Sequence, residues 1–359
     1  MSVSTPLVRP VPVGVRPAPP SEAPRPTLAI AGGGRLRSVV LSVLLGMGLS
    51  LPSVGHAEDA NPTRSGDVTL HIVSFGAVHG EISDCGCKTD PKGGLDLRWG
   101  YVGSLLEAGV PVLHLDAGNF FSNQEFGAEE VTRFLWDAMQ KMELDATTPG
   151  KRELGNWPLY EEFLKQDAIP IVSSNLTIMT DGVERPLGQP FLVVQRGGLR
   201  IGVLGLIGGL EFTEVRFPEG VDVRFANPLT ATRKALMAMG EEVDLVVLLS
   251  QRPRPDTEAL LRQIPEIDVA ILGNLPSFDE APGRVGDAFV QSTGSKGQYL
   301  GDLQLTIDPH GTIVDHAAKN CLMWEPLPRD QEMHERVDKM KARVEEIKKD
   351  AQGAARAGH

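Results

Sequence analysis

Cysteine and aromatic residues are scarce in this chain of 359 residues, which contains three Cys and 5% Phe, Trp and Tyr. Three cysteines cannot supply the dense disulfide framework that stabilises small secreted domains. Basic residues are also in deficit, because 47 Asp and Glu exceed 35 Lys and Arg and give a net charge of −12. Such an acidic chain lacks the electrostatic footprint of a nucleic-acid-binding protein. A hydrophobic fraction of 41% is ample for a packed core, so we expect a globular fold.

The N-terminal region has no helical or strand periodicity, and its one apolar run, residues 38–52, is short. Two Arg precede this run, and small residues follow it up to Ala57, an order that is typical of a cleaved secretory signal peptide. The alternative, a membrane anchor, requires roughly 20 apolar residues. We therefore expect a Pro-rich leader and signal peptide over residues 1–57 and a linker over 58–67. Cleavage would remove five Arg and one Glu, change the net charge from −12 to −16 and leave an exported periplasmic or extracellular protein without a membrane span.

Strand-length apolar runs alternate with helical patterns in the rest of the chain, which is typical of an α/β fold with buried strands. Gly197-Gly198 stands between two such runs and predicts a hairpin, hence a mixed sheet. Strands are expected over residues 68–75, 111–117, 168–175, 191–195, 200–206, 244–250, 268–273, 289–292 and 300–308. Helices are expected over residues 96–108, 127–142, 158–166, 228–239 and 256–263. A charged helix over 329–355 carries an apolar stripe, Met333, Val337, Met340 and Val344, which we expect to pack on the domain.

The loops that follow the predicted strands hold most of the candidate functional residues. Ligands of open α/β sheets bind beyond the carboxyl ends of strands, where loops and helix N-termini converge. In chain order these loops contain His79-Gly80, Asp116-Ala117-Gly118-Asn119, Gly150-Lys151-Arg152-Glu153, Ser250-Gln251 and Gly273-Asn274-Leu275-Pro276. By its order and spacing, this set of blocks resembles the 5′-nucleotidase branch of the calcineurin-like metallophosphoesterases.

The resemblance covers roughly residues 68–308 and is supported by further blocks. These are Pro91-Lys92-Gly93-Gly94-Leu95 with Arg98, Ser174-Asn175-Leu176, Gly198 to Gly205, Asn227-Pro228, and Gly294 to Gly301. It implies a four-layer α/β/β/α fold with mixed sheets over residues 68–326, followed by a charged helix and tail over 327–359. We expect no C-terminal substrate domain of the kind that full nucleotidases carry. The family's activity is hydrolysis of phosphate esters by water that two metal ions activate.

Most positions where the resemblance implies metal ligands hold other residues. His79 keeps its imidazole, whereas Ala77 stands where the family has Asp. The other replacements are Asn119 for the bridging carboxylate, Lys151-Arg152-Glu153 for Asn-His-Glu, Gln251 for His, and Asn274 and Pro276 for two His. Neutral amides and cations cannot neutralise two metal ions as carboxylates do. We therefore expect hydrolysis to be weakened or lost. A divergent hydrolase would depend on a divalent metal such as manganese and on His79, Arg152 and Glu153 for catalysis.

Two further hypotheses remain open. In the first, the fold is a non-catalytic pseudoenzyme in which Arg98, Lys151 and Arg152 bind a small phosphorylated molecule or another anion. In the second, chemistry has moved to Cys85-Gly86-Cys87, which with His79 would form a zinc or copper site, or a redox site with an unidentified partner. Asp84, Asn119, Asn274 and Cys321 are possible additional ligands. A Cys85–Cys87 disulfide would close a small, strained ring, so a disulfide that involves Cys321 is the easier alternative.

Purely structural roles compete with each of these hypotheses. His79 can serve as a simple hydrogen-bonding residue of the fold. Cys321 resembles a small buried hydrophobe, and His114 a core histidine, because it alternates with apolar residues. Asp116 lies three residues before the family's ligand position, so we expect it to order its loop.

Overall fold

The computed structural model describes residues 65–357, except 86–88, 90, 181, 209–211, 213, 241, 275–277 and 325. All the described residues belong to one structural unit, residues 60–359. The expected leader, residues 1–57, and most of the expected linker lie outside the described residues. The signal peptide therefore stays a prediction.

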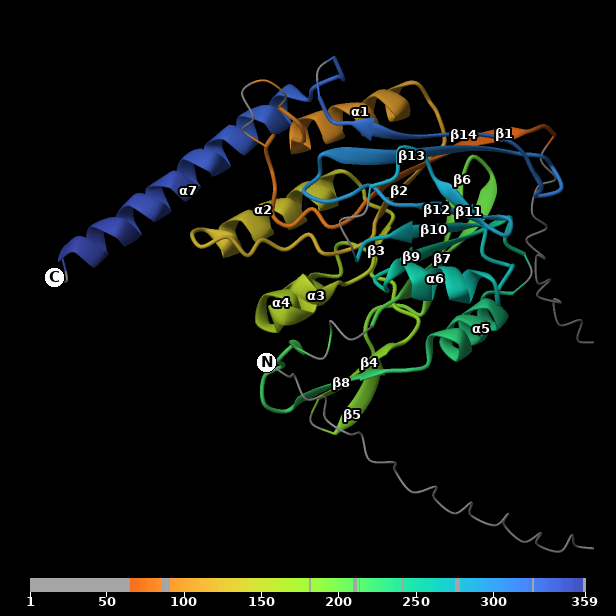
Figure 1. Ribbon diagram of the computed structural model, residues 1–359, viewed down its shortest axis with the longest axis horizontal. Coiled ribbons are helices and arrows are strands. Elements are labelled where there is room, and N and C mark those ends of the chain that lie inside the picture. The colour runs from red at the N-terminus through yellow and green to blue at the C-terminus, as the bar shows by residue number, and fades with distance from the viewer. Residues whose placement is uncertain are drawn as a thin grey trace, which may run out of the picture. The chain divides into compact units, whose positions relative to one another are not determined.

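One mixed sheet contains the N-terminal strand, and its order is β14-β13-β1-β2-β3. The strands are β1 (Val68–Phe75), β2 (Val112–Asp116), β3 (Ala146–Thr147), β13 (Tyr299–Ile307) and β14 (Ile313–Leu322). Strand β1 is parallel to β2 and antiparallel to β13. Its sequence VTLHIVSF has β-branched and apolar residues at both alternating positions, which suits a strand that is covered on both faces. Helices α1 (Leu95–Glu107) and α2 (Ala128–Lys141) lie outside this sheet (Figure 1).

A second mixed sheet has the order β11-β12-β10-β9-β7-β6. Its strands are β6 (Phe191–Arg196), β7 (Leu199–Leu206), β9 (Leu245–Ser250), β10 (Val269–Leu272), β11 (Gly283–Val285) and β12 (Ala288–Gln291). The predicted hairpin at Gly197-Gly198 is confirmed, since β6 and β7 are antiparallel and both glycines have positive φ, as a tight hairpin turn requires. Helices α5 (Pro228–Met239) and α6 (Arg254–Leu261) pack on its outer face.

The two sheets pack face to face through a fully apolar layer. Leu70, Leu113 and Leu303 from the first sheet join Ile201, Val247 and Val269 from the second in one buried cluster. Residues of the opposite parity on the same strands face the helices: Val73 and Phe75 contact α1, and Leu204 and Val246 contact α5 and α6. The predicted α/β/β/α arrangement with mixed sheets is therefore confirmed.

A third, small sheet lies apart from this sandwich and was not predicted. It has the order β5-β4-β8 and consists of β4 (Leu176–Thr180), β5 (Val183–Pro186) and β8 (Val221–Phe225). Every residue of β5 is exposed, and its sequence VERP has no apolar run that would indicate a buried strand. The strand expected over 168–175 is wrong: only Ile171 and Val172 form isolated bridges, because this segment bonds successively to different neighbours.

The C-terminal helix α7 (Gln331–Ala357) packs through the predicted stripe. Met333 and Val337 are buried in the cluster that contains α2, and Met340 and Val344 are partly buried against it. Its start is also tied to α1, since Asp96 accepts from Arg329 and from His334 Nδ1, the latter at 2.7 Å. None of the helices in the described part of the chain has the length and apolarity of a membrane span.

Candidate functional site

The loops at the carboxyl ends of the strands meet, as expected, at one edge of the sandwich. The loop after β1 is bonded to the loop after β2, because the amides of Ala77 and His79 donate to the carbonyls of Gly118 and Asn119 at 2.8 and 3.0 Å. In the second sheet, Gly273 N donates to Ser250 O at 2.9 Å and so joins the ends of β10 and β9. Backbone hydrogen bonds thus fix the place of each candidate residue.

Three non-glycine residues in these loops have a left-handed backbone. Ala77, His79 and Asn119 have φ angles of 51°, 59° and 62°. Asn tolerates this conformation well, but for Ala and His it costs free energy that the surrounding bonds must offset. Strain of this kind is common where loops are held in a fixed functional or ancestral geometry.

A network of side-chain amides fills the centre of the site. Asn119 Nδ2 donates to Gln251 Oε1 at 2.8 Å and to Gly273 O at 3.3 Å. Asn119 Oδ1 accepts from Arg152 N at 3.1 Å, and Gln251 Nε2 donates to Ala117 O. Both amide side chains are buried, at 5% and 0% exposure of the whole residues. Because donors and acceptors are matched within the network, it is a neutral, closed structure.

Close backbone contact leaves no spare room around this network. A Cβ on Gly273 would lie 1.9 Å from Ala117 O and 2.5 Å from Gln251 Nε2. A Cβ on Gly118 would lie 2.2 Å from Thr148 O. The glycines therefore let strands of the two sheets approach until the amides of Asn119 and Gln251 meet.

Glu153 supports the network, because its buried carboxylate accepts hydrogen bonds from backbone amides. Its carboxylate accepts from the amides of Asn119, Phe120, Phe121 and Gly150 at distances from 2.7 to 3.0 Å. Burial raises the pKa of Glu153, and the donated amides oppose that shift. Glu153, which the sequence suggested as a catalytic residue, is completely buried. Its hydrogen bonds order the two loops that carry Asn119 and Arg152.

The donor set at the centre does not fit a divalent metal pair. Asn119 and Gln251 are neutral and already bonded to each other, and the carboxylates of Asp116 and Glu153 accept backbone amides. Across the described residues, no three or more His, Cys, Asp and Glu side chains converge on a point where they could hold a metal ion. Metal ions bind where anionic or imidazole ligands remain available to neutralise them.

The cysteine site stays a prediction, because Cys87 lies outside the described residues. Cys85 is exposed and lines a small cavity of about 130 Å³ with Glu81, Lys92 and Lys296. Asn274 follows the end of β10, next to the network.

Cys321 lies on β14, where it is partly buried beside α1. Its Sγ donates to Tyr101 Oη at 3.8 Å, and burial raises the pKa of its thiol. Tyr101 in turn donates to Asp302 at 2.7 Å. These contacts agree with the structural role expected for Cys321.

Cationic groups gather at the outer ends of the same loops. Burial, together with the nearby charges of Arg152 and Lys296, lowers the pKa of His79 to about 4. His79 is therefore neutral at pH 7 in a positive local potential. Arg152 Nη1 donates to Phe121 O at 3.2 Å, and its pKa is lowered chiefly by burial. Glu81 is the nearby carboxylate, 3.9 Å from Lys296 Nζ.

The other two predicted anion-binding residues lie in different surroundings. Lys151 is paired with Glu214 at 2.6 Å on the surface. Arg98 is only 3% exposed and lies on the ring of Phe75, 3.7 Å from its centroid. Burial lowers the pKa of Arg98 to about 10, although the charge of Asp116 opposes this. Of the predicted cations, the structure brings only Arg152 close to His79.

His114 and Asp116 have the structural roles that were expected. His114 is buried and its Nδ1 lies 3.3 Å from Met142 O, and burial lowers its pKa to about 3. Asp116 orders its loop by accepting from Gly118 N at 2.7 Å. Burial raises the pKa of Asp116 to about 6, and Arg98 opposes this shift.

Sequence reasoning missed Lys296 and Glu81 as members of the site. Lys296 stands between Gly294 and Gly297 in a block that entered only as part of the family resemblance, and it has a φ of 63°. Its backbone amide donates to Ala77 O at 2.8 Å, which fixes it beside the loop of His79. The sequence signal that could have indicated Lys296 is a lysine in a glycine-rich turn, Gly294 to Gly297.

Comparisons of sequence link this chain to 5′-nucleotidases. It is 29% identical over 192 residues to a probable 5′-nucleotidase of Treponema pallidum, a match that covers 47% of this chain and 32% of the relative. It is 23% identical over 316 residues to the snake venom 5′-nucleotidase of Crotalus adamanteus, covering 78% of this chain and 52% of the relative. The chain thus spans about half the length of these curated relatives or less. No family model matches the sequence.

Comparisons of structure give the same fold. The 5′-nucleotidase precursor of Thermus thermophilus superposes with a TM-score of 0.66 at 23% identity, over 77% of this chain and 59% of that one. The calcineurin-like phosphoesterase YfkN of Bacillus subtilis gives 0.62 at 17% identity, over 79% of this chain and 99% of that one. The chain therefore has the calcineurin-like metallophosphoesterase fold and, among such proteins, resembles the 5′-nucleotidases.

Proposed function

We propose that this chain is a binding protein built on the metallophosphoesterase fold, which holds a small anion at His79, Arg152 and Lys296 without hydrolysing it. The observation that supports this proposal most strongly is the buried amide pair of Asn119 and Gln251, 2.8 Å apart. The pair occupies the meeting point of the strand-end loops, where a hydrolase of this fold would need charged ligands.

Two-metal hydrolysis needs ligands that neutralise two dications and hold them a few ångströms apart. Here the side chains of Asn119 and Gln251 are neutral, and the positive charge of Arg152 acts on the nearby His79. A dication bound at this point would break the matched hydrogen bonds of Asn119, and it would find no carboxylate ligand in exchange. The residues present therefore favour binding over metal-assisted catalysis.

The outer cations supply what an anion requires. Arg152 uses one guanidinium nitrogen for Phe121 O, so its fork can still donate to a bound oxyanion. Arg152 is partly buried, and this loss of water lowers its pKa. An ion pair formed there is therefore stronger than one in open water. His79 adds a neutral imidazole, and Lys296 adds a second charge from the opposite loop. A phosphate group or the phosphate of a small ester fits this chemistry.

Isothermal titration calorimetry with inorganic phosphate tests the proposal. Arg152→Gln should weaken binding about tenfold, because it removes a charge-assisted hydrogen bond. Glu81→Gln should tighten binding about threefold, since it removes the carboxylate that competes for Lys296. Arg343→Gln, an exposed cation on α7, is the matched control and should leave binding unchanged.

A hydrolysis assay distinguishes the competing function. With p-nitrophenyl phosphate and added manganese we expect no turnover above that of the buffer. Turnover that His79→Ala abolishes would overturn the proposal and restore a divergent hydrolase. Equal phosphate affinity for the wild type and Arg152→Gln would also overturn it.

Export is a separate part of the proposal, and it is supported by the composition of residues 35–57 and by a relative that is described as a precursor. Mass spectrometry of the protein recovered from the periplasm should show an N-terminus close to residue 58. An intact N-terminus in the cytoplasm would contradict it.

A further inference from the structure

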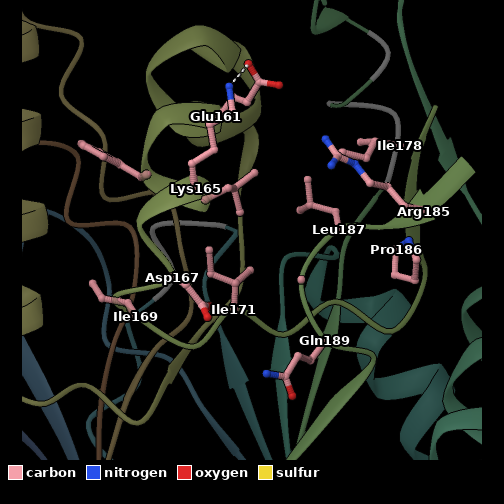
Figure 2. Close-up of a pocket in the computed structure, with 13 residues that line it drawn as sticks. Glu161, Lys165, Asp167, Ile169, Ile171, Ile178, Arg185, Pro186, Leu187 and Gln189 are labelled. Atoms are coloured by element: carbon pink, nitrogen blue, oxygen red, sulfur yellow. Dashed lines mark ion pairs between the residues drawn. The ribbon is translucent and has the colours of Figure 1, made fainter. Parts of the chain in front are cut away.

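A cavity that none of the strand-end loops lines lies between α4 (Trp157–Gln166) and the small third sheet (Figure 2). Its volume is about 340 Å³, which is within the range of small-molecule sites. Residues from the end of α4, the segment after it and strands β4 and β5 line it. Nothing in the anion-binding proposal uses it.

The floor of this cavity is aliphatic and rigid. Ile171, Ile178 and Leu187 line it and are buried to 7%, 3% and 1% exposure. Backbone bonds fix these walls, because Leu187 N donates to Leu176 O at 3.1 Å and Gln189 N to Ile171 O at 2.8 Å. A pre-formed aliphatic surface of this kind favours a hydrocarbon group.

The strand register brings a guanidinium onto the same face. Arg185 of β5 pairs with Ile178 of β4 in the antiparallel ladder, so the two side chains project from the same side of the sheet. Arg185 thus takes a position in an apolar row, and its side chain extends toward α4 (Figure 2). In the described part of the chain, Arg185 forms no ion pair, whereas Lys165 on the facing wall is paired with Glu161 at 3.2 Å.

We propose that this cavity binds a medium-chain carboxylate, with its hydrocarbon on Ile171, Ile178 and Leu187 and its carboxylate on Arg185. A planar guanidinium holds a carboxylate through two parallel hydrogen bonds. Glu161 and Asp167 also line the cavity, so a dianion such as a phosphate monoester meets about twice the repulsion that a monoanion meets. Charge and shape together select an amphiphilic monoanion.

Calorimetric titration of the full chain with octanoate, 1-octanol and acetate tests this site. Octanoate should bind about tenfold more tightly than 1-octanol, which lacks the charge, and acetate, which lacks the chain, should be weaker still. Arg185→Gln should weaken octanoate about tenfold and leave 1-octanol unchanged, a split that a general loss of structure would not produce. The exposed side chain of Arg185 makes unfolding of this variant unexpected.

Arg224→Gln is the matched control, because Arg224 lies on β8 of the same sheet and is paired with Glu184 and Asp222. It should leave octanoate binding unchanged. The proposal is overturned if octanoate gives no binding up to about 10 mM. It is also overturned if wild-type affinity is equal for octanoate and 1-octanol, or if the two Arg variants behave alike.

Discussion

The inner and outer ends of the strand-end loops differ sharply, although they belong to the same segments. At the inner end, Asn119 and Gln251 are buried, uncharged and hydrogen-bonded to each other. At the outer end, Arg152 and Lys296 leave His79 in a positive potential at a partly exposed surface. The uncharged pair is thus buried, whereas the positive charge lies at the partly exposed surface, where we propose that an anion binds.

This difference shows how backbone bonds can set the geometry of a site independently of the chemistry of its side chains. The backbone bonds that bring the loops together do not depend on the ligand side chains. Matched amides can stabilise this convergence of loops, because a closed network leaves few buried groups unsatisfied. The following predictions test the inner end against the outer end.

The largest effect is expected at Glu153. Glu153→Gln places an NH₂ group against backbone amides that now donate to the carboxylate, so it should lower the free energy of unfolding by about 4 kcal/mol. Urea denaturation at pH 7 measures this. Glu162→Gln, in an exposed pair with Arg133, should lower the free energy of unfolding far less. Similar losses in the two variants would mean that Glu153 does not order the loops.

Gly273→Ala should break the inner end sterically. The added Cβ meets Ala117 O and Gln251 Nε2, and the backbone must shift, which costs about 3 kcal/mol of unfolding free energy. Gly283→Ala on β11 is the control, because nothing lies within 4 Å of its Cβ. Chemical denaturation of both proteins provides the comparison. A loss below about 1 kcal/mol for Gly273→Ala would contradict the close packing described here.

Asn119→Asp tests neutrality itself, because it changes charge with little change of shape and Asp tolerates a left-handed backbone. The carboxylate would face the acceptors Gln251 Oε1 and Gly273 O in a buried place, and we expect a loss of about 2 kcal/mol at pH 7. The loss should shrink as the pH falls and the carboxylate is protonated. Asn227→Asp, at the exposed cap of α5, should be nearly neutral. A pH-independent loss would indicate that charge is not the cause.

The smallest effect concerns the outer end and its pH dependence. The pKa of His79 is about 4 in the folded chain and about 6.5 when unfolded. Its contribution to the free energy of unfolding is therefore fully present above pH 6.5. It is lost as the pH falls toward 4, because the unfolded chain takes up the proton first. For a part-exposed ring this is at most about 1 kcal/mol. His79→Gln should reduce the fall in stability between pH 7 and pH 4.5, which the midpoints of urea denaturation measure. An unchanged fall would contradict the role given to His79.

The sequence predicted most strands and helices to within a few residues, because buried runs and helical stripes are local patterns. Strand β1 and helix α5 begin and end where they were expected. It did not predict β5, whose residues are all exposed, or strands β3, β4, β8, β11 and β14, and the strand expected over 168–175 is reduced to isolated bridges at Ile171 and Val172. Those elements depend on neighbours that are distant in the chain, and no local periodicity indicates them.

By itself, the sequence determined the order of the elements and predicted that other residues stand in the strand-end loops where the family resemblance implies metal ligands. Only the tertiary structure decided how those residues contact one another. Asn119 and Gln251 meet because two sheets pack through one apolar layer and glycines such as Gly273 allow their strand ends to approach. Likewise, Arg185 reaches an aliphatic cavity because its register sets it beside Ile178. Residue types are local, whereas such pairings arise from packing and are fixed only when the chain has folded.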